Sequence, residues 1–82
     1  MSVSLRFEPD FSGVNQVFNG LGERWALDII ERFSDVCSHL SPDEVSKIAQ
    51  AMSVENMEKE EQKQLQKAFA EAARQNCWLM IR

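Results

Sequence analysis

The chain has 82 residues, of which 44% are hydrophobic and 27% are charged, and its formal net charge is −4. This length gives room for one domain with one modest core, and the composition excludes a collagen-like, coiled-coil or disordered chain. Acidic residues outnumber basic ones by 13 to 9, so a general affinity for the phosphate backbone of nucleic acid has no obvious source. We therefore predict a single compact domain over residues 1–82.

The sequence indicates a cytoplasmic location. Its first residues, MSVSLRFEP, lack the basic stretch and apolar core of a secretory signal. No apolar run approaches the roughly 20 residues of a membrane span, so we expect no membrane association. In a reducing compartment Cys37 and Cys77 are expected to be buried thiols and not a disulfide.

Residues 2–8 alternate apolar and polar side chains, with Val3, Leu5 and Phe7 on one side and Arg6 on the other. This period of two predicts a half-buried strand that ends before Pro9, because proline cannot donate a ladder hydrogen bond.

Residues 10–21 have a weaker helical pattern. Asp10 or Ser12 could cap the helix, and Gly20 and Gly22 bracket Leu21 at its end. We predict a short helix, then a glycine break; one continuous kinked helix is the alternative.

Residues 23–40 have the most regular apolar spacing in the chain and predict the central helix. The apolar residues lie three or four apart, at Trp25, Ala26, Ile29, Ile30, Phe33, Val36, Cys37 and Leu40. The charged residues between them, Glu23 included, are expected to face water. His39 falls near the predicted C-terminus, where an imidazolium can stabilise a helix.

A second helix is predicted to begin directly after Leu40. Ser41 is placed to be its N-cap, Pro42 its first residue, and Glu44 the partner that completes a capping box. The spacing of its apolar residues predicts the buried side as Val45, Ile48, Ala49 and Met52.

The last helix is predicted to begin after a corner in residues 52–56, with Ser53 or Asn56 as its cap. The run from Glu58 to Gln64 contains no apolar residue and is expected to be its solvated first turns. The buried positions that follow are Leu65, Ala68, Phe69, Ala72 and Ala73. Asn76 is expected to end the helix.

Residues 77–81 form a short apolar run that we interpret as a strand, with a frayed helical tail as the alternative. A lone N-terminal strand needs a partner for its backbone groups, and the C-terminal run can supply one. The predicted fold is α+β and mostly α, with three to four short helices and a two-stranded sheet formed by the N- and C-terminal strands.

The sequence offers little for catalysis or for binding a metal or cofactor. Cys37, His39 and Cys77 are too few for a structural zinc site, and the first two lie only two residues apart on a predicted helix. No phosphate-binding glycine motif, nucleophile elbow or carboxylate pair is present. We therefore predict no catalytic residue, no metal, no cofactor and no enzymatic activity.

Three features favour binding to another protein. Tryptophan is enriched at interface hot spots, and Trp78 is the candidate because Trp25 continues the apolar stripe of a helix. An open strand edge can pair with another chain. The polar helix face around residues 55–67 could meet a basic partner. The candidate partner-binding residues are Trp78, Met80, Arg6, Glu58 and Glu61.

The predicted function is that of a small acidic protein–protein interaction module. It would form a homodimer, or be an accessory protein that binds and blocks a larger protein or complex. Small acidic chains without an active site are common among phage-borne inhibitors, including anti-CRISPR proteins. The alternative is a nucleic-acid-binding regulator that uses the corner before Ser41 as a helix–turn–helix. Its second helix offers Lys47 and Gln50, but also Asp43 and Glu44 at the end that reads bases.

Overall fold

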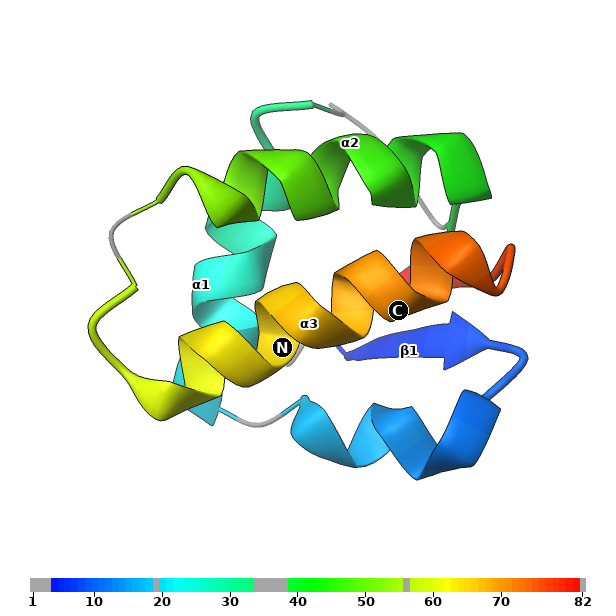
Figure 1. Ribbon diagram of the computed structural model, residues 1–82, viewed down its shortest axis with the longest axis horizontal. Coiled ribbons are helices and arrows are strands. Elements are labelled where there is room, and N and C mark those ends of the chain that lie inside the picture. The colour runs from blue at the N-terminus through cyan, green and yellow to red at the C-terminus, as the bar shows by residue number, and fades with distance from the viewer. Residues whose placement is uncertain (1–3, 19, 34–38, 56, 82) are drawn as a thin grey trace.

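A computed structural model describes residues 4–18, 20–33, 39–55 and 57–81 of the chain (Figure 1). In chain order its elements are β1 (Leu5–Glu8), the 3-10 helix η1 (Phe11–Val17), α1 (Gly20–Ile30), β2 (His39–Leu40), α2 (Pro42–Ser53), α3 (Glu60–Arg74) and β3 (Trp78–Ile81). The described part is therefore mostly helical with a small sheet, as predicted for an α+β chain.

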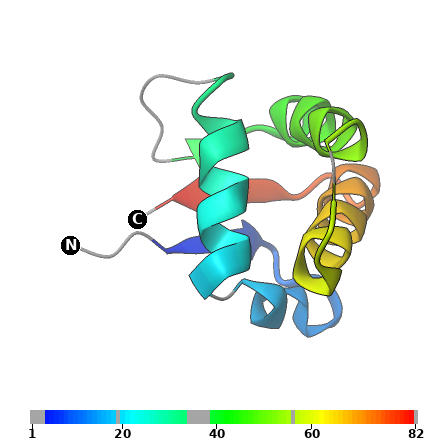
Figure 2. The ribbon, with the colours of Figure 1, turned by 90° about the vertical axis from the view of Figure 1, so that its left-hand side faces the viewer.

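The helices pack around one side of the sheet. α2 and α3 run antiparallel next to each other, and α1 crosses at a steep angle (Figure 1). Figure 2 shows β2, β3 and β1 stacked with β3 in the middle, while α1 lies across them and the α2–α3 pair flanks them. The buried side chains from the helices and the sheet form one hydrophobic core.

The sheet has three antiparallel strands in the order β1-β3-β2. The prediction of a two-stranded sheet was right about the terminal strands, which pair as expected, but wrong about the number. β3 pairs with β1 on one side and with β2 on the other. Phe7, Leu79 and Leu40 lie opposite one another in one row across the strands, and each is fully buried. This row is the contribution of the sheet to the hydrophobic core.

The prediction of one helix over residues 23–40 was wrong at the described residues 31–33, 39 and 40. α1 ends at Ile30, and the backbone N–H groups of Arg32 and Phe33 then donate to residues three positions earlier, which tightens the chain into a turn. Val36 and Cys37 lie outside the described residues, and His39 and Leu40 belong to a strand. The apolar spacing is regular, but residues 34–39, SDVCSH, are all weak helix formers.

A short helix separate from α1 is present, as predicted, but the extended backbone of Phe18 ends it and the glycines do not form the break. Gly20 is the first residue of α1, and Gly22 lies in its first turn, where a glycine interrupts no established helix. The preceding segment is a 3-10 helix with left-handed backbone at Ser12 (φ 54°) and Gly13 (φ 67°). Trp25 in α1 is partly buried and packs against the core, which agrees with its predicted role.

α2 confirms its prediction in full. The Ser41 hydroxyl accepts from the backbone N–H of Glu44 at 3.4 Å, and the Glu44 carboxylate accepts from the backbone N–H of Ser41 at 3.3 Å. Pro42 is the first residue of the helix. The four residues predicted to be buried, Val45, Ile48, Ala49 and Met52, are the buried ones.

α3 begins later than predicted, and neither proposed cap is used. Ser53 closes α2 instead, and Asn56 lies outside the described residues. The helix begins at Glu60, where the side-chain Oε1 of Gln62 accepts from the backbone N–H groups of Glu58 (2.9 Å) and Lys59 (3.0 Å). This amide oxygen binds the two residues before the helix, and the N-cap residue Lys59 makes no side-chain cap hydrogen bond to the first turn.

An aromatic cluster joins the N-terminal part of the chain to α3. The Phe7 ring lies 5.2 Å from Phe18, 5.0 Å from Phe69 and 6.0 Å from Phe11, measured between ring centroids. Phe7 and Phe69 meet edge to face, a favoured geometry for two aromatic rings. The cluster holds η1 against β1 and α3.

Candidate functional site

The direction of β3 is set by the end of α3. Asn76 has φ of 57°, and its backbone N–H donates to the Ala73 carbonyl at 3.2 Å. The N–H of Cys77 reaches back to the Ala72 carbonyl at 2.9 Å. These two bonds are the Schellman motif, and they confirm Asn76 as the predicted helix end. The chain then enters β3 with the Cys77 side chain buried and Trp78 exposed.

Five side chains form the surface of the sheet that points away from the core, which we call the outer sheet face: Arg6, Glu8, His39, Trp78 and Met80. The register places Arg6 and His39 on either side of Met80, and Glu8 opposite Trp78. Because side chains alternate along a strand, these residues share the face opposite to the buried row. Trp78 retains 44% of its surface, and Met80 is partly buried.

Two contacts organise this face. The His39 and Trp78 rings lie 5.5 Å apart between centroids and are tilted by 52°. The Arg6 Nε lies 3.6 Å from the Glu8 carboxylate, and about half of each side chain remains exposed. An exposed pair at this distance is weak, so the Glu8 carboxylate can exchange partners at little cost. The face therefore presents two aromatic rings beside a carboxylate.

The outer edge of β1 does not offer a strand for pairing, contrary to prediction. The side chain of Asn15 accepts from the Phe7 N–H (2.6 Å) and donates to the Phe7 carbonyl (3.2 Å). The Glu23 carboxylate accepts from the Leu5 N–H at 3.0 Å. Two side chains thus occupy three of the backbone groups that another strand would need. Glu23 was expected to face water, but it faces this edge.

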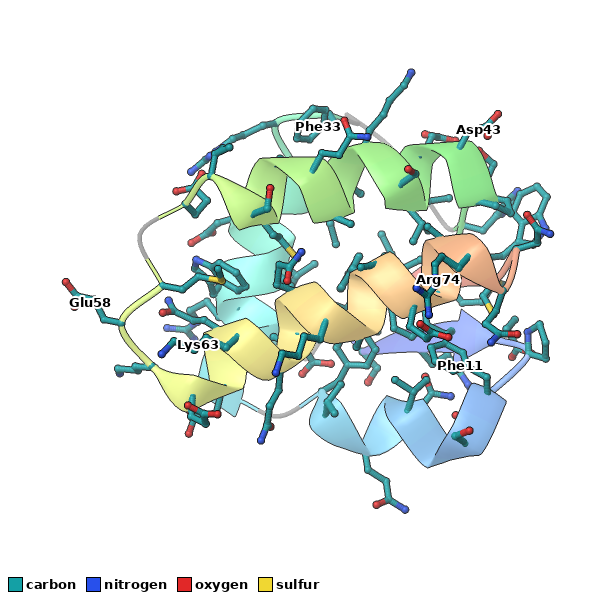
Figure 3. The ribbon with its side chains drawn as sticks, viewed as in Figure 1. Phe11, Phe33, Asp43, Glu58, Lys63 and Arg74 are labelled. Atoms are coloured by element: carbon teal, nitrogen blue, oxygen red, sulfur yellow. The ribbon has the colours of Figure 1, made fainter. Side chains whose placement is uncertain are left out.

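The predicted partner-binding residues separate into two groups. Trp78, Met80 and Arg6 come together on the outer sheet face. Glu58 projects at the far end of the molecule from Asp43 and Arg74 (Figure 3). Glu61 lies in the first turn of α3, and the helix rises about 20 Å between it and Arg74. Trp78 follows Arg74 by only four residues, at the other end of α3 from Glu61. Glu58 and Glu61 therefore do not belong to the same site as Trp78.

Sequence reasoning missed two members of the face. The alternation in residues 2–8 already places Glu8 on the same side of the strand as Arg6, but Glu8 was not chosen as a candidate binding residue. His39 was placed on a helix, and nothing local in the sequence marks it as a strand residue. Its partner, β3, lies about 40 residues away in the sequence.

Two of the three residues considered for a metal or a catalytic pair, His39 and Cys77, are described, and they do not come together. Cys77 lies in the core, and burial raises the pKa of its thiol. His39 lies on the opposite side of the sheet, and Cys37 is outside the described residues. Across residues 4–18, 20–33, 39–55 and 57–81, no three His, Cys, Asp or Glu side chains are close enough to hold a metal ion.

The helix–turn–helix corner expected before Ser41 is not formed. Eleven residues separate the end of α1 at Ile30 from the start of α2 at Pro42, and the strand β2 precedes α2 with only Ser41 between them. Lys47 and Gln50 are exposed on α2, but the first turn carries Asp43 and Glu44. A recognition helix would present this acidic end to the base edges in the major groove, whose surroundings are negatively charged.

A shallow groove of about 380 Å³ runs between α2 and α3. Its lining is mostly small or amide side chains, and Arg74 is its one charged residue. No acid–base pair lies there, so the groove offers no catalytic constellation.

No protein-family model matches the chain, and no curated protein or solved structure matches it significantly. Within the described ranges, no helix has the length and apolar character needed to cross a bilayer. The outer sheet face, with its exposed Trp78, is therefore the candidate site.

Proposed function

We propose that this chain is a protein–protein interaction module that binds its partner through the outer sheet face, with Trp78 as the anchor. One observation supports this most strongly: Trp78 is 44% exposed on the central strand of a sheet whose other side is buried. A large aromatic on a rigid strand loses little conformational freedom when it binds, and tryptophan dominates many interfaces.

The side chains around Trp78 have the polar character typical of the rim of a protein–protein interface. Arg6, Glu8 and His39 offer hydrogen bonds and charge around Trp78, and Met80 adds a flexible apolar surface. We propose that the chain acts by occupying a surface of a larger protein, as an accessory or blocking protein of the cytoplasm does. A nucleic-acid-binding regulator is the weaker candidate because the acidic first turn of α2 opposes it.

The test compares two exposed aromatic residues on different faces. Tagged Trp78→Thr and Phe33→Ala variants are used beside the unchanged chain to retain proteins from a lysate of the source cells. Phe33 is 50% exposed and lies in the turn after α1, off the outer sheet face. We expect the partner to be lost with Trp78→Thr and kept with Phe33→Ala, both variants giving an unchanged circular dichroism spectrum.

Threonine is chosen because it favours a strand, so the Trp78 variant should fold. Retention of the same protein by Trp78→Thr would contradict the proposed site. A gel-shift measurement at low salt tests the weaker candidate: tight, salt-sensitive binding of DNA or RNA would replace the protein-binding proposal.

A further inference from the structure

We infer that the partner presents an arginine or lysine side chain to the outer sheet face, where it lies over the Trp78 ring and pairs with Glu8. The inference rests on the proposed function and specifies the chemistry of its partner. It depends on the position of Glu8 opposite Trp78 and on the exposure of both side chains.

The geometry of the strand pair brings the two groups together. Glu8 and Trp78 are directly opposed in the β1–β3 register, so their Cβ atoms lie about 5 Å apart. The face of an indole attracts a cation, and a carboxylate at its edge can accept hydrogen bonds from the same cation. A planar guanidinium satisfies both at once because it stacks flat and donates along its edge.

The existing contacts leave room for such a cation. The Arg6 Nε is 3.6 Å from Glu8 Oε1, which is longer than a hydrogen bond. The His39 ring contacts Trp78 at a tilt, and a tilted neighbour does not cover a ring as a stacked one does. An incoming guanidinium can therefore replace Arg6 at Glu8.

Charge over the whole molecule favours the same ligand. The formal net charge is −4, so the field around the chain attracts a basic partner and opposes an acidic one. Arg6 is a local cation on the face, and its removal should strengthen binding of a basic side chain. Removal of Glu8 should have the opposite effect and weaken this binding.

A second copy of the chain is a poorer occupant. Three strands of four residues or fewer give a face of only about 10 by 14 Å. A stable dimer buries roughly 800 Å² on each partner, several times this area. A second copy also carries the same net charge of −4, which opposes the association of two copies and favours a basic partner.

The probe is a hexa-arginine peptide, with hexa-citrulline as its uncharged control of nearly the same shape. The chain is labelled with ¹⁵N at its tryptophans, and the two indole N–H signals are assigned with the Trp25→Phe variant. We expect the Trp78 signal to shift saturably with hexa-arginine, the Trp25 signal to stay in place, and added salt to weaken binding.

Two variants with the same loss of charge separate a local contact from general attraction. Glu8→Gln should weaken binding about two- to fivefold, the range of an exposed ion pair. Glu61→Gln removes the same charge far from Trp78 and should weaken binding much less, because it changes only the general attraction. Arg6→Gln should raise it.

Three results would overturn the inference: an unmoved Trp78 signal, an equal response to hexa-citrulline, or equal weakening by Glu8→Gln and Glu61→Gln. A Trp78 shift that grows with protein concentration alone would show a self-interface and overturn it as well. If Trp78→Thr loses the lysate partner while the peptide fails, the proposed function stands and only the basic partner is rejected. If Trp78→Thr keeps the partner, both are rejected.

Discussion

The side chain of Asn15 takes the place of a neighbouring strand for Phe7, because it both accepts from the Phe7 N–H and donates to the Phe7 carbonyl. Phe7 is fully buried and is the centre of the aromatic cluster, so these two bonds hold a core residue in register. They also explain how a four-residue edge strand can remain closed to other chains.

Asn15→Ala should therefore lower the free energy of unfolding by about 1–3 kcal/mol, because a partly buried backbone donor and acceptor lose their partners. The measurement is urea unfolding followed by circular dichroism. Gln16→Ala is the control: Gln16 is the exposed neighbour and should change stability by less than about 0.5 kcal/mol. Equal stability of the two variants would mean that Asn15 does not hold the edge.

The second prediction concerns the capping box of α2 and compares the stability effects of replacing two serines, one at the cap and one inside the helix. Ser41→Ala should cost about 1 kcal/mol because the Glu44 N–H loses its acceptor. Ser46→Ala, within the helix, should be neutral or slightly stabilising because alanine is the better helix former. Thermal and urea unfolding measure both, and a destabilising effect of equal size at both positions would contradict the capping role.

How much of this fold the sequence could predict depends on how local the signals are. α2 was predicted from its cap to its buried residues because Ser41, Pro42 and Glu44 lie within four positions. The strand after α3 was predicted on another ground, that the N-terminal strand needs a partner. The end of α3 at Asn76, like α2, was predicted from a local signal. Such signals involve only neighbours in the chain, so tertiary contacts had little opportunity to override them.

The errors lie where a distant segment decides the structure. Residues 39 and 40 have helical apolar spacing, yet they pair with β3, which has a free side for a third strand. Glu23 was expected to face water because its partner, the Leu5 N–H, is 18 residues away. The spacing of apolar residues in a segment cannot reveal hydrogen-bond partners that lie far away in the sequence.

The candidate site was predictable to the same extent. Alternation in the terminal strands indicates which side chains point outward, and it brought Arg6, Trp78 and Met80 to one face. Glu58 and Glu61 were chosen for charge alone, without a position in the fold, and they lie elsewhere. Charge indicates that a side chain is exposed, but only the pairing register of the strands shows which exposed side chains lie together.

The left-handed backbone at Asn76 yields a third prediction about how Trp78 is oriented. Asn76→Ala should cost about 1 kcal/mol, because a Cβ without a local hydrogen bond disfavours φ of 57°. Asn76→Gly should be neutral or stabilising, because glycine tolerates this conformation. Urea unfolding gives the stabilities, and the Trp78 indole signal reports whether the strand moves. An alanine variant as stable as the glycine variant would show that the helix end does not require this geometry.

The fourth prediction concerns alkaline pH and the Cys77 thiol. Burial raises its pKa above the ordinary value of 9.0, and the thiol also donates weakly to the Pro9 carbonyl at 3.5 Å. Below about pH 8 the thiol is protonated in the folded and unfolded chain alike, so it gives no pH dependence there. As the pH rises past the unfolded pKa, the unfolded chain loses the proton first, and the folded chain binds more protons. The free energy of unfolding must then fall with pH, by at most about 1.4 kcal/mol per pH unit, until the folded thiol also ionises.

Cys77→Ala isolates this contribution because every other titrating group is common to both proteins. Urea unfolding under reducing conditions is measured at intervals from about pH 7 to about pH 10, the interval that spans the thiol transition. Alanine leaves a small cavity, so the unchanged chain should be more stable at neutral pH, and this advantage should shrink at alkaline pH. An advantage that stays constant over the whole interval would mean that the thiol ionises equally easily in both states. Burial would then not govern its titration.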